Sequence, residues 1–288
     1  MDRMGKLLRI TCICFLLLST LTGCKKELWP DLFPSPDPPP PPTVEIETEP
    51  ATLVPVSTSY NNMTNGFYLA QPVKYNSSGK RYPLIVWIHG AGQFGNGNSD
   101  LALVLREGIP KMFVDKKIAP NYPVGTENLS FMMVAPQFIG YPSVQQVQSF
   151  VDSLKKNYRI DSTRIYLSGM SIGGIITCDV TGGNPNSYAA ILPMGGVSRP
   201  GTDLAEKTRR IAAGKVAVWA FHNEDDFVYN ISEARNFIAL INRNVPPVLA
   251  KLTTYPTGGH DAWTRHSDPV FRENNLNIYE WMLQYKRQ

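Results

Sequence analysis

The chain has 288 residues, 43% of them hydrophobic, which suits one domain with a sizeable core behind a short leader. Its formal net charge is +4 and it has no dense run of lysine and arginine, so a nucleic-acid-binding protein is not expected. The four histidines are scattered and no cysteine cluster accompanies them, so we expect no metal site.

The N-terminal residues are typical of a secretion signal. A basic segment at residues 3–9 precedes an apolar stretch at residues 10–21 that is too short for a permanent transmembrane helix. The small residues before Cys24 resemble the lipobox of bacterial lipoproteins, in which this cysteine is acylated. The alternative is a plain secretory signal with an incidental cysteine. We expect residues 1–23 to be removed, and lipid on Cys24 to anchor the protein outside the cytoplasm, in the periplasm or at the outer membrane.

A proline-rich segment separates this leader from the domain. Residues 34–42 favour extended polyproline II, which cannot build a core, so we interpret them as a spacer rather than as an SH3-type ligand. We assign residues 24–50 to a tether and residues 51–288 to the folded domain. Cys178 is the one cysteine in that domain's sequence, so we expect no intrachain disulfide and a core position for this side chain.

The domain alternates predicted strands and helices. Apolar runs predict strands at residues 51–56, 66–71, 83–88, 131–135, 164–168, 189–194, 216–221 and 248–255. Helical spacing predicts helices at 144–158, from 174 onward, at 231–241 with Ser232 as its cap, and over most of 268–285. This alternation predicts an α/β fold with a mostly parallel sheet, in which the chemistry gathers at the carboxyl ends of the strands.

The most informative motif is Gly-Met-Ser-Ile-Gly at residues 169–173. It lies between a predicted strand and a predicted helix, as the nucleophile elbow of serine hydrolases does. In such a turn the serine takes a strained conformation, and the flanking glycines avoid clashes. Ser171 is therefore the candidate nucleophile, exposed where the helix dipole favours a developing negative charge.

A serine nucleophile needs a base and a group that orients the base. His260 follows the last predicted strand in a Gly-Gly loop and is the candidate base, with His266 as the fallback. The acid should lie between the serine and the histidine in the chain, and an acidic turn after the strand at 216–221 supplies it. We choose Asp226, with Asp225 second.

An oxyanion hole requires two N–H donors that point at the tetrahedral oxygen. The amide of Ile172, directly after the serine, is one candidate. The glycine-rich loop at residues 89–95 follows the first long central strand, and the amide of Ala91 in this loop is the other candidate. We interpret His89 as a residue that braces this loop by hydrogen bonds.

These motifs together resemble the α/β-hydrolase superfamily, and most of all its phospholipase/carboxylesterase-like group, which includes predicted peptidases and feruloyl or acetylxylan esterase-like proteins. The matching pieces lie at residues 84–92, 169–174, 221–226 and 259–264, in the family order. The resemblance implies a central sheet of about eight strands flanked by helices. Asn223 departs from the family pattern, which commonly has glycine there, and this leaves the choice between Asp225 and Asp226 less certain.

The resemblance also implies an activity. Members of this family hydrolyse carboxylic esters through an acyl-enzyme and use no cofactor. The expected substrate is a small or polysaccharide-linked ester outside the cytoplasm, and the expected membrane contact is the lipid on Cys24. A serine peptidase of the same fold and a non-catalytic binding lipoprotein are the alternatives.

Overall fold

The computed structural model of the chain describes residues 46–199 and 201–287. The predicted signal peptide, the lipidation site at Cys24 and the tether up to residue 45 lie outside the described residues. Glu45–Gln288 forms one compact unit. Glu47 already packs against this unit, because its buried carboxylate accepts hydrogen bonds from the Lys74 amide at 3.1 and 3.2 Å. The packed body therefore begins a few residues before the predicted boundary at residue 51.

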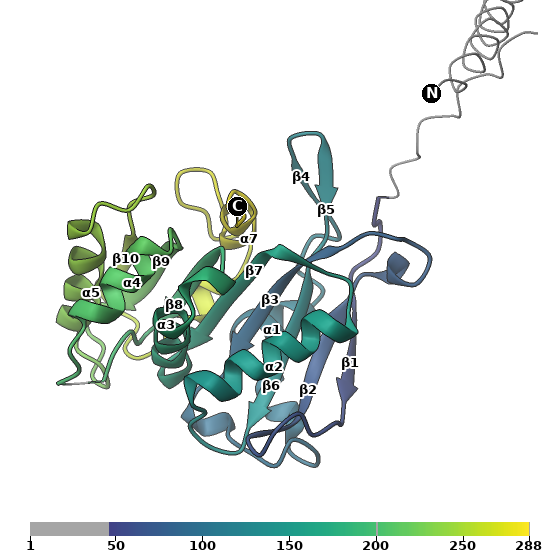
Figure 1. Cartoon of the computed structure of the whole chain (residues 1–288), viewed down its shortest axis with the longest axis horizontal. Coiled ribbons are helices and arrows are strands. Elements are labelled where there is room, and N and C mark those ends of the chain that lie inside the picture. Colours follow the sequence, from purple (N-terminus) through teal and green to yellow (C-terminus); the bar gives the residue numbers. More distant parts are fainter. Residues whose placement is uncertain (1–45, 200, 288) are drawn as a thin grey trace, which may run out of the picture. The chain divides into compact units, whose positions relative to one another are not determined.

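An eight-stranded sheet forms the centre of the molecule (Figure 1). In spatial order its strands are β1 (Thr52–Val56), β2 (Thr64–Gln71), β6 (Met132–Phe138), β3 (Tyr82–Ile88), β7 (Ile160–Met170), β8 (Ala190–Met194), β9 (Ala217–Asn223) and β10 (Lys251–Tyr255). β2 pairs antiparallel with both β1 and β6, and all the pairs from β6 through β3, β7, β8 and β9 to β10 are parallel. The predicted fold class, a mostly parallel sheet of about eight strands flanked by helices, is confirmed.

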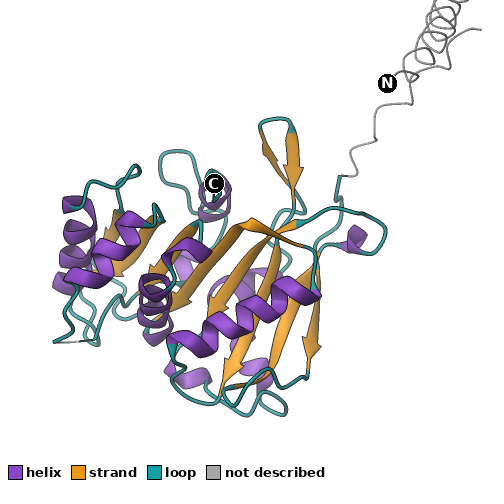
Figure 2. Ribbon diagram, in the orientation of Figure 1, coloured by secondary structure: helices purple, strands orange, loops and turns teal. Residues whose placement is uncertain are grey.

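Helices lie on both faces of this sheet (Figure 2). They are α1 (Gly108–Val114), α2 (Val144–Asn157), α3 (Ile172–Gly183), α4 (Ala205–Ala213), α5 (Ile231–Arg243), α6 (Thr264–Ser267) and α7 (Ile278–Leu283). Short 3-10 turns occur at Val73–Tyr75, Ala91–Gln93, Leu101–Leu105 and Pro185–Ser187, and a separate hairpin is made of β4 (Tyr122–Val124) and β5 (Glu127–Leu129).

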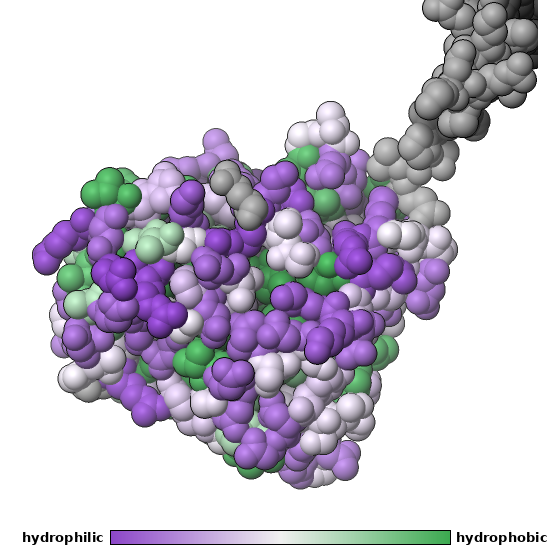
Figure 3. Space-filling model, in the orientation of Figure 1, coloured by the Kyte–Doolittle hydropathy of each residue, from purple (hydrophilic) through white to green (hydrophobic). Residues whose placement is uncertain are grey.

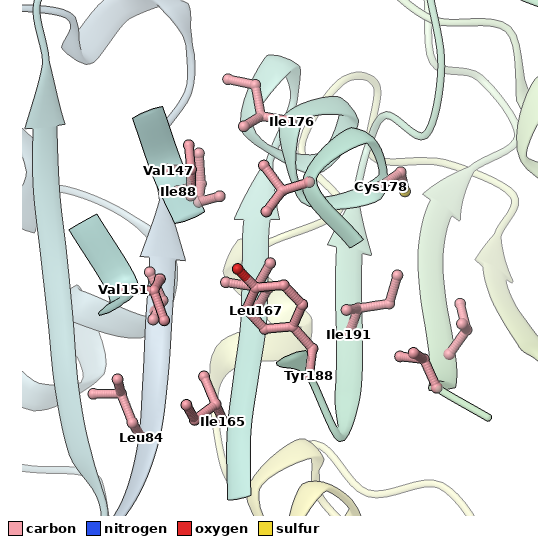
Figure 4. Close-up of a cluster of buried hydrophobic side chains, with 14 of the residues drawn as sticks. Leu84, Ile88, Val147, Val151, Ile165, Leu167, Ile176, Cys178, Tyr188 and Ile191 are labelled. Atoms are coloured by element: carbon pink, nitrogen blue, oxygen red, sulfur yellow. The ribbon is translucent and has the colours of Figure 1, made fainter. Parts of the chain in front are cut away.

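The central strand β3 explains why the sheet has two cores. Its residues are all buried, and alternate side chains point to opposite faces. Leu84, Val86 and Ile88 pack with α2, α3, α4 and α5, whereas Ile85 and Trp87 pack with α1 and α7. Figure 4 shows part of the first core, where Cys178 lies fully buried as the sequence predicts. A strand covered on both faces has to be apolar throughout, as this one is.

Two predicted details are wrong. Most of residues 268–285 is not helical: Pro269 follows α6, Asn274 and Asn275 have positive φ angles of 53° and 64°, and α7 begins after an Asn277 capping box. The cap of α5 is Asn230 rather than Ser232, because the Asn230 side chain accepts from the Ser232 amide at 2.9 Å.

The face shown in Figure 3 is mostly hydrophilic, with separate apolar side chains scattered over it. Within the described part of the chain, no helix has both the length and the apolar character that crossing a bilayer requires.

Candidate active site

The elbow at Ser171 forms as its sequence predicts. Ser171 has φ 54° and ψ −124°, between the end of β7 and the start of α3, and its amide donates to the Met194 carbonyl at 2.7 Å. A Cβ on Gly169 would lie 2.4 Å from the Gly173 carbonyl oxygen, and one on Gly173 would lie 2.1 Å from the Ile88 carbonyl oxygen. Both glycines are therefore required by close backbone contacts, and they let the turn project the serine beyond the sheet.

A continuous hydrogen-bonded array joins the three predicted catalytic side chains. His260 Nε2 lies 2.7 Å from Ser171 Oγ, and His260 Nδ1 lies 2.8 Å from Asp226 Oδ2. The Asp226 side chain is fully buried, whereas 17% of the His260 side chain is exposed. The serine comes from the β7 elbow, the acid from the turn after β9 and the histidine from the loop after β10, so the array lies along the carboxyl edge of the sheet.

Several polar groups surround the buried Asp226 carboxylate. Besides His260, its Oδ2 lies 3.2 Å from His222 Nε2, and its Oδ1 accepts from the amides of Val228 at 2.8 Å and Tyr229 at 3.1 Å. These donors satisfy a buried carboxylate that would otherwise be costly, and they fix its direction toward His260.

His222 lies against this carboxylate, and its position beside Asp226 was not predicted from the motifs. Its Nε2 also lies 2.9 Å from the Tyr229 carbonyl, so this nitrogen carries the proton. Burial lowers the pKa of His222, which keeps the ring neutral near pH 7. His222 therefore donates to the Tyr229 carbonyl, and this places its ring against the Asp226 carboxylate.

The neighbouring acid, Asp225, has a different task. Its carboxylate accepts from the amides of Gly258 at 3.2 Å and Gly259 at 2.7 Å, directly before His260. Asn223 supports the same loop, because its amide group donates to the carbonyls of Gly259 at 3.2 Å and Asp261 at 3.0 Å. The side chain that departs from the family pattern thus braces the loop that carries His260.

The other predicted histidines are buried away from the serine. His89 donates from Nδ1 to the Gly90 carbonyl at 2.8 Å and accepts at Nε2 from the Phe138 amide at 3.0 Å. His266 is 1% exposed and lies 2.6 Å from the Ala262 carbonyl, among the rings of Phe221 and Phe271. The geometry of His89 agrees with its interpretation as a brace, and the fallback base, His266, does not reach Ser171.

Acid should destabilise the fold through these two histidines. Burial lowers the pKa of His89 to about 4 and that of His266 to about 4. Because the unfolded rings titrate near 6.5, the unfolded chain binds more protons between pH 6.5 and 4, and stability is lost as the pH falls. From pH 7.5 to pH 5 we expect each histidine to lower the free energy of unfolding by about 2 kcal/mol, measured by urea unfolding. The variants His89→Gln and His266→Gln should each show a shallower pH dependence, and a dependence equal to wild type in both would contradict this account.

Two backbone amides border the serine as oxyanion donors. Ile172 is the first residue of α3 and Ala91 the first of its 3-10 turn, so neither N–H has an acceptor within its own helix. A Cβ on Gly90 would lie 3.6 Å from Ser171 Cβ, which brings the loop that carries Ala91 against the serine. The structure thus places both predicted donors beside Ser171, while their catalytic role stays a prediction.

Within residues 46–199 and 201–287, no group of His, Cys, Asp and Glu side chains could hold a metal ion. A hollow lined by residues such as Glu47, Tyr82 and Asn128 includes no member of the array. Ser171 is half-buried at the carboxyl edge of the sheet.

A model of the phospholipase/carboxylesterase family matches residues 139–270, which include Ser171, Asp226 and His260. A crystal structure of a thermostable esterase shares the fold, with a TM-score of 0.57 and 22% identity over 84% of this chain and 64% of that one. The protein therefore has the α/β-hydrolase fold, and over residues 139–270 it is similar to the phospholipase/carboxylesterase family.

This α/β-hydrolase is also similar to two further proteins. A bifunctional acetylxylan esterase/xylanase from Neocallimastix patriciarum is 30% identical over 163 residues, which are 56% of this chain and 21% of that protein. The feruloyl esterase module of Clostridium thermocellum, solved with sinapinate, has a TM-score of 0.54 and 16% identity over 79% of this chain and 87% of that one. The chain thus spans about a fifth of the curated relative it matches. The family match supports the prediction that this α/β-hydrolase cleaves carboxylic esters.

Proposed function

We propose that this protein is a carboxylic-ester hydrolase that works through an acyl-enzyme on Ser171. The observation that carries this proposal is the hydrogen-bonded array from Ser171 through His260 to buried Asp226, at an elbow whose backbone admits no side chain at Gly169 or Gly173. An array that relays a proton from a strained, partly exposed serine has the parts that acyl transfer requires.

The reaction follows from this geometry. Ser171 Oγ attacks the ester carbonyl carbon while His260 Nε2 takes the serine proton, and the carbonyl oxygen becomes an oxyanion next to the amides of Ile172 and Ala91. The C–O bond of the ester then breaks, and His260 returns the proton to the leaving alcohol. Water attacks the acyl-serine by the same steps and releases the acid. Asp226 holds the imidazole tautomer and stabilises the imidazolium that forms transiently.

For the substrate we propose acylated polysaccharide. Ser171 and His260 are both partly exposed at the carboxyl edge of the sheet, so an ester carried on a polymer can reach the serine. The similarity to an acetylxylan esterase/xylanase, the one sequence relative named above, favours this class over other esters. The intact array disfavours a non-catalytic binding protein, since the fold alone does not require these three side chains together.

A substrate panel tests the proposal. We expect turnover of p-nitrophenyl acetate, p-nitrophenyl butyrate and acetylated xylan or a feruloyl ester, and no turnover of a peptide p-nitroanilide. A fluorophosphonate probe should label the wild type and leave Ser171→Ala unlabelled. Preferred cleavage of the anilide would indicate a peptidase. Failure to label or to turn over any of these compounds would favour the binding protein.

We also propose that lipid on Cys24 holds the enzyme at a membrane outside the cytoplasm. The support is the basic, apolar and small-residue order of the first 24 residues, together with the proline-rich spacer behind them. Cys24→Ser should move the protein from the membrane fraction to the soluble fraction. Cys14→Ser, a matched change inside the predicted signal peptide, should stay in the membrane fraction. Membrane retention of Cys24→Ser would refute the anchor.

A further inference from the structure

The loop after β8 brings an arginine to the rim of the candidate active site. A Cβ on Gly196 would lie 2.5 Å from the Ser171 carbonyl oxygen, so this loop runs against the elbow. Val197 and Ser198 are each 2% exposed, and Ser198 Oγ donates to Glu233 Oε2 at 3.1 Å. Arg199 is the first exposed residue after this anchored stretch. Because three residues of extended chain span about 11 Å at most, the Cα atom of Arg199 lies within about 11 Å of that of Gly196, which contacts the elbow.

The guanidinium of Arg199 is held in place by a ring rather than by an acid. Its Cζ lies 3.8 Å from the centroid of the Tyr141 ring. Tyr141 is fixed in turn, because its hydroxyl donates to Asp179 at 2.8 Å, and Asp179 already forms an ion pair with Lys207. In the part of the chain that the structure describes, Arg199 has no aspartate or glutamate oxygen within 4.0 Å. Its positive charge is therefore oriented and lacks a counterion.

Tyr229 interacts with both the charge of Arg199 and the His260 ring of the array. The Tyr229 ring lies 5.5 Å from the His260 ring, centroid to centroid. Burial raises the pKa of the Tyr229 hydroxyl, and the positive charge of Arg199 opposes this shift. The guanidinium therefore interacts electrostatically with the residue that packs against His260. Tyr141 follows β6, Arg199 follows β8 and Tyr229 follows β9, and all three strands end at the edge that carries Ser171.

We propose that Arg199, stacked on Tyr141, is a specificity-determining residue that binds a carboxylate of the substrate close to the ester cleaved at Ser171. The inference rests on the proposed ester hydrolase activity and adds to it a preference for anionic esters over neutral ones. A guanidinium whose face is covered by a ring can still donate from its N–H edges, and these edges match the two oxygens of a carboxylate. The carboxylate can belong to the acyl half or to the alcohol half of the ester.

Two pairs of isosteric esters separate these cases. Mono-p-nitrophenyl glutarate against p-nitrophenyl 5-methylhexanoate tests a carboxylate on the acyl half. 4-Acetoxybenzoate against 4-acetoxybenzamide tests one on the alcohol half. Within each pair, the ratio of kcat/KM for the anionic ester over the neutral ester is compared between enzymes, so intrinsic reactivity cancels. Arg199→Met removes the charge and keeps most of the stem, Arg199→Lys keeps the charge, and Arg209→Met is a matched change of an exposed arginine on α4.

We expect Arg199→Met to lower the ratio about tenfold for one of the two pairs, mainly through KM of the anionic ester. Arg199→Lys should retain most of the ratio, and Arg209→Met should keep the wild-type value. The wild-type ratio should fall at high salt, because an exposed charge pair is screened. Unchanged ratios for both pairs in Arg199→Met would overturn the proposal, even though turnover of the neutral esters would leave the hydrolase function intact. Loss of turnover in every enzyme, without probe labelling of Ser171, would instead reject the hydrolase function itself.

Discussion

Replacing Ser171 with alanine is expected to lower kcat for p-nitrophenyl butyrate by a factor of about 10⁶. Without the hydroxyl no acyl-enzyme forms, and only the oxyanion donors and substrate binding remain. His260→Ala should cost about as much, because a serine hydroxyl is a poor nucleophile once the base 2.7 Å away is gone. The double variant should be no slower than either single variant, since the two residues act as one unit.

The control for this prediction is Ser153→Ala, a half-buried serine on α2 outside the array, which should keep wild-type kcat. Urea unfolding of Ser171→Ala should give a free energy of unfolding within about 1 kcal/mol of wild type, which separates a lost nucleophile from a lost fold. Residual activity of more than a hundredth of wild type in Ser171→Ala would mean that another group attacks the ester.

The elbow and the strands could be predicted from short sequence patterns because the contacts that determine them involve residues within those patterns or directly beside them. The two glycines of residues 169–173 are required by contacts within one turn and with the adjacent β3, and the apolar run of β3 reflects cover on both faces. The carboxyl edge then brings together residues that follow different strands, so the chain order of Ser171, Asp226 and His260 could be predicted without their distances.

Other elements left weaker signals. α1 begins at Gly108, whose φ is +66°, and contains Pro110, so its sequence has the residues of a turn. α4 is short and mostly polar, with an Arg209–Glu206 pair on its exposed side, and its buried face carries Thr208, Ile211 and Ala212, so few large apolar residues mark it. Asn274 and Asn275 end the predicted helical period through left-handed conformations that the spacing of apolar residues does not reveal.

The sequence does not determine which of the two carboxylates in the acidic turn contacts His260. Asp225 and Asp226 are adjacent, and both make hydrogen bonds to groups on or around the His260 loop. Which carboxylate faces the imidazole depends on the path of the turn, and that path is set by contacts with residues more than thirty positions away. Asn223 braces the same loop through hydrogen bonds to residues that are also far away in the sequence. The sequence marked this residue only by having asparagine where the family commonly has glycine.

Replacing Asp226 with asparagine is expected to lower kcat by a factor of about 10⁴ while leaving KM nearly unchanged. An amide in the place of the carboxylate removes the charge that stabilises the imidazolium, and it allows the wrong tautomer of His260 to form. Replacing Asp225 with asparagine should cost only about tenfold, because one oxygen remains to accept from the Gly259 amide at this position. Asp203→Asn, a surface change before α4, should leave kcat unchanged.

The Asp225→Asn/Asp226→Asn double variant distinguishes the two roles. Both residues act through His260, one by orienting and charging the ring and the other by holding its loop, so their losses should couple rather than multiply. In Asp226→Asn the imidazole already contributes little to kcat, because its tautomer is no longer fixed. A small displacement of its loop then lowers kcat only slightly further. We therefore expect the double variant to be no more than about threefold slower than Asp226→Asn, from steady-state kcat on p-nitrophenyl butyrate. A larger loss in Asp225→Asn than in Asp226→Asn would reverse the assignment, with Asp225 orienting His260 and Asp226 holding the turn.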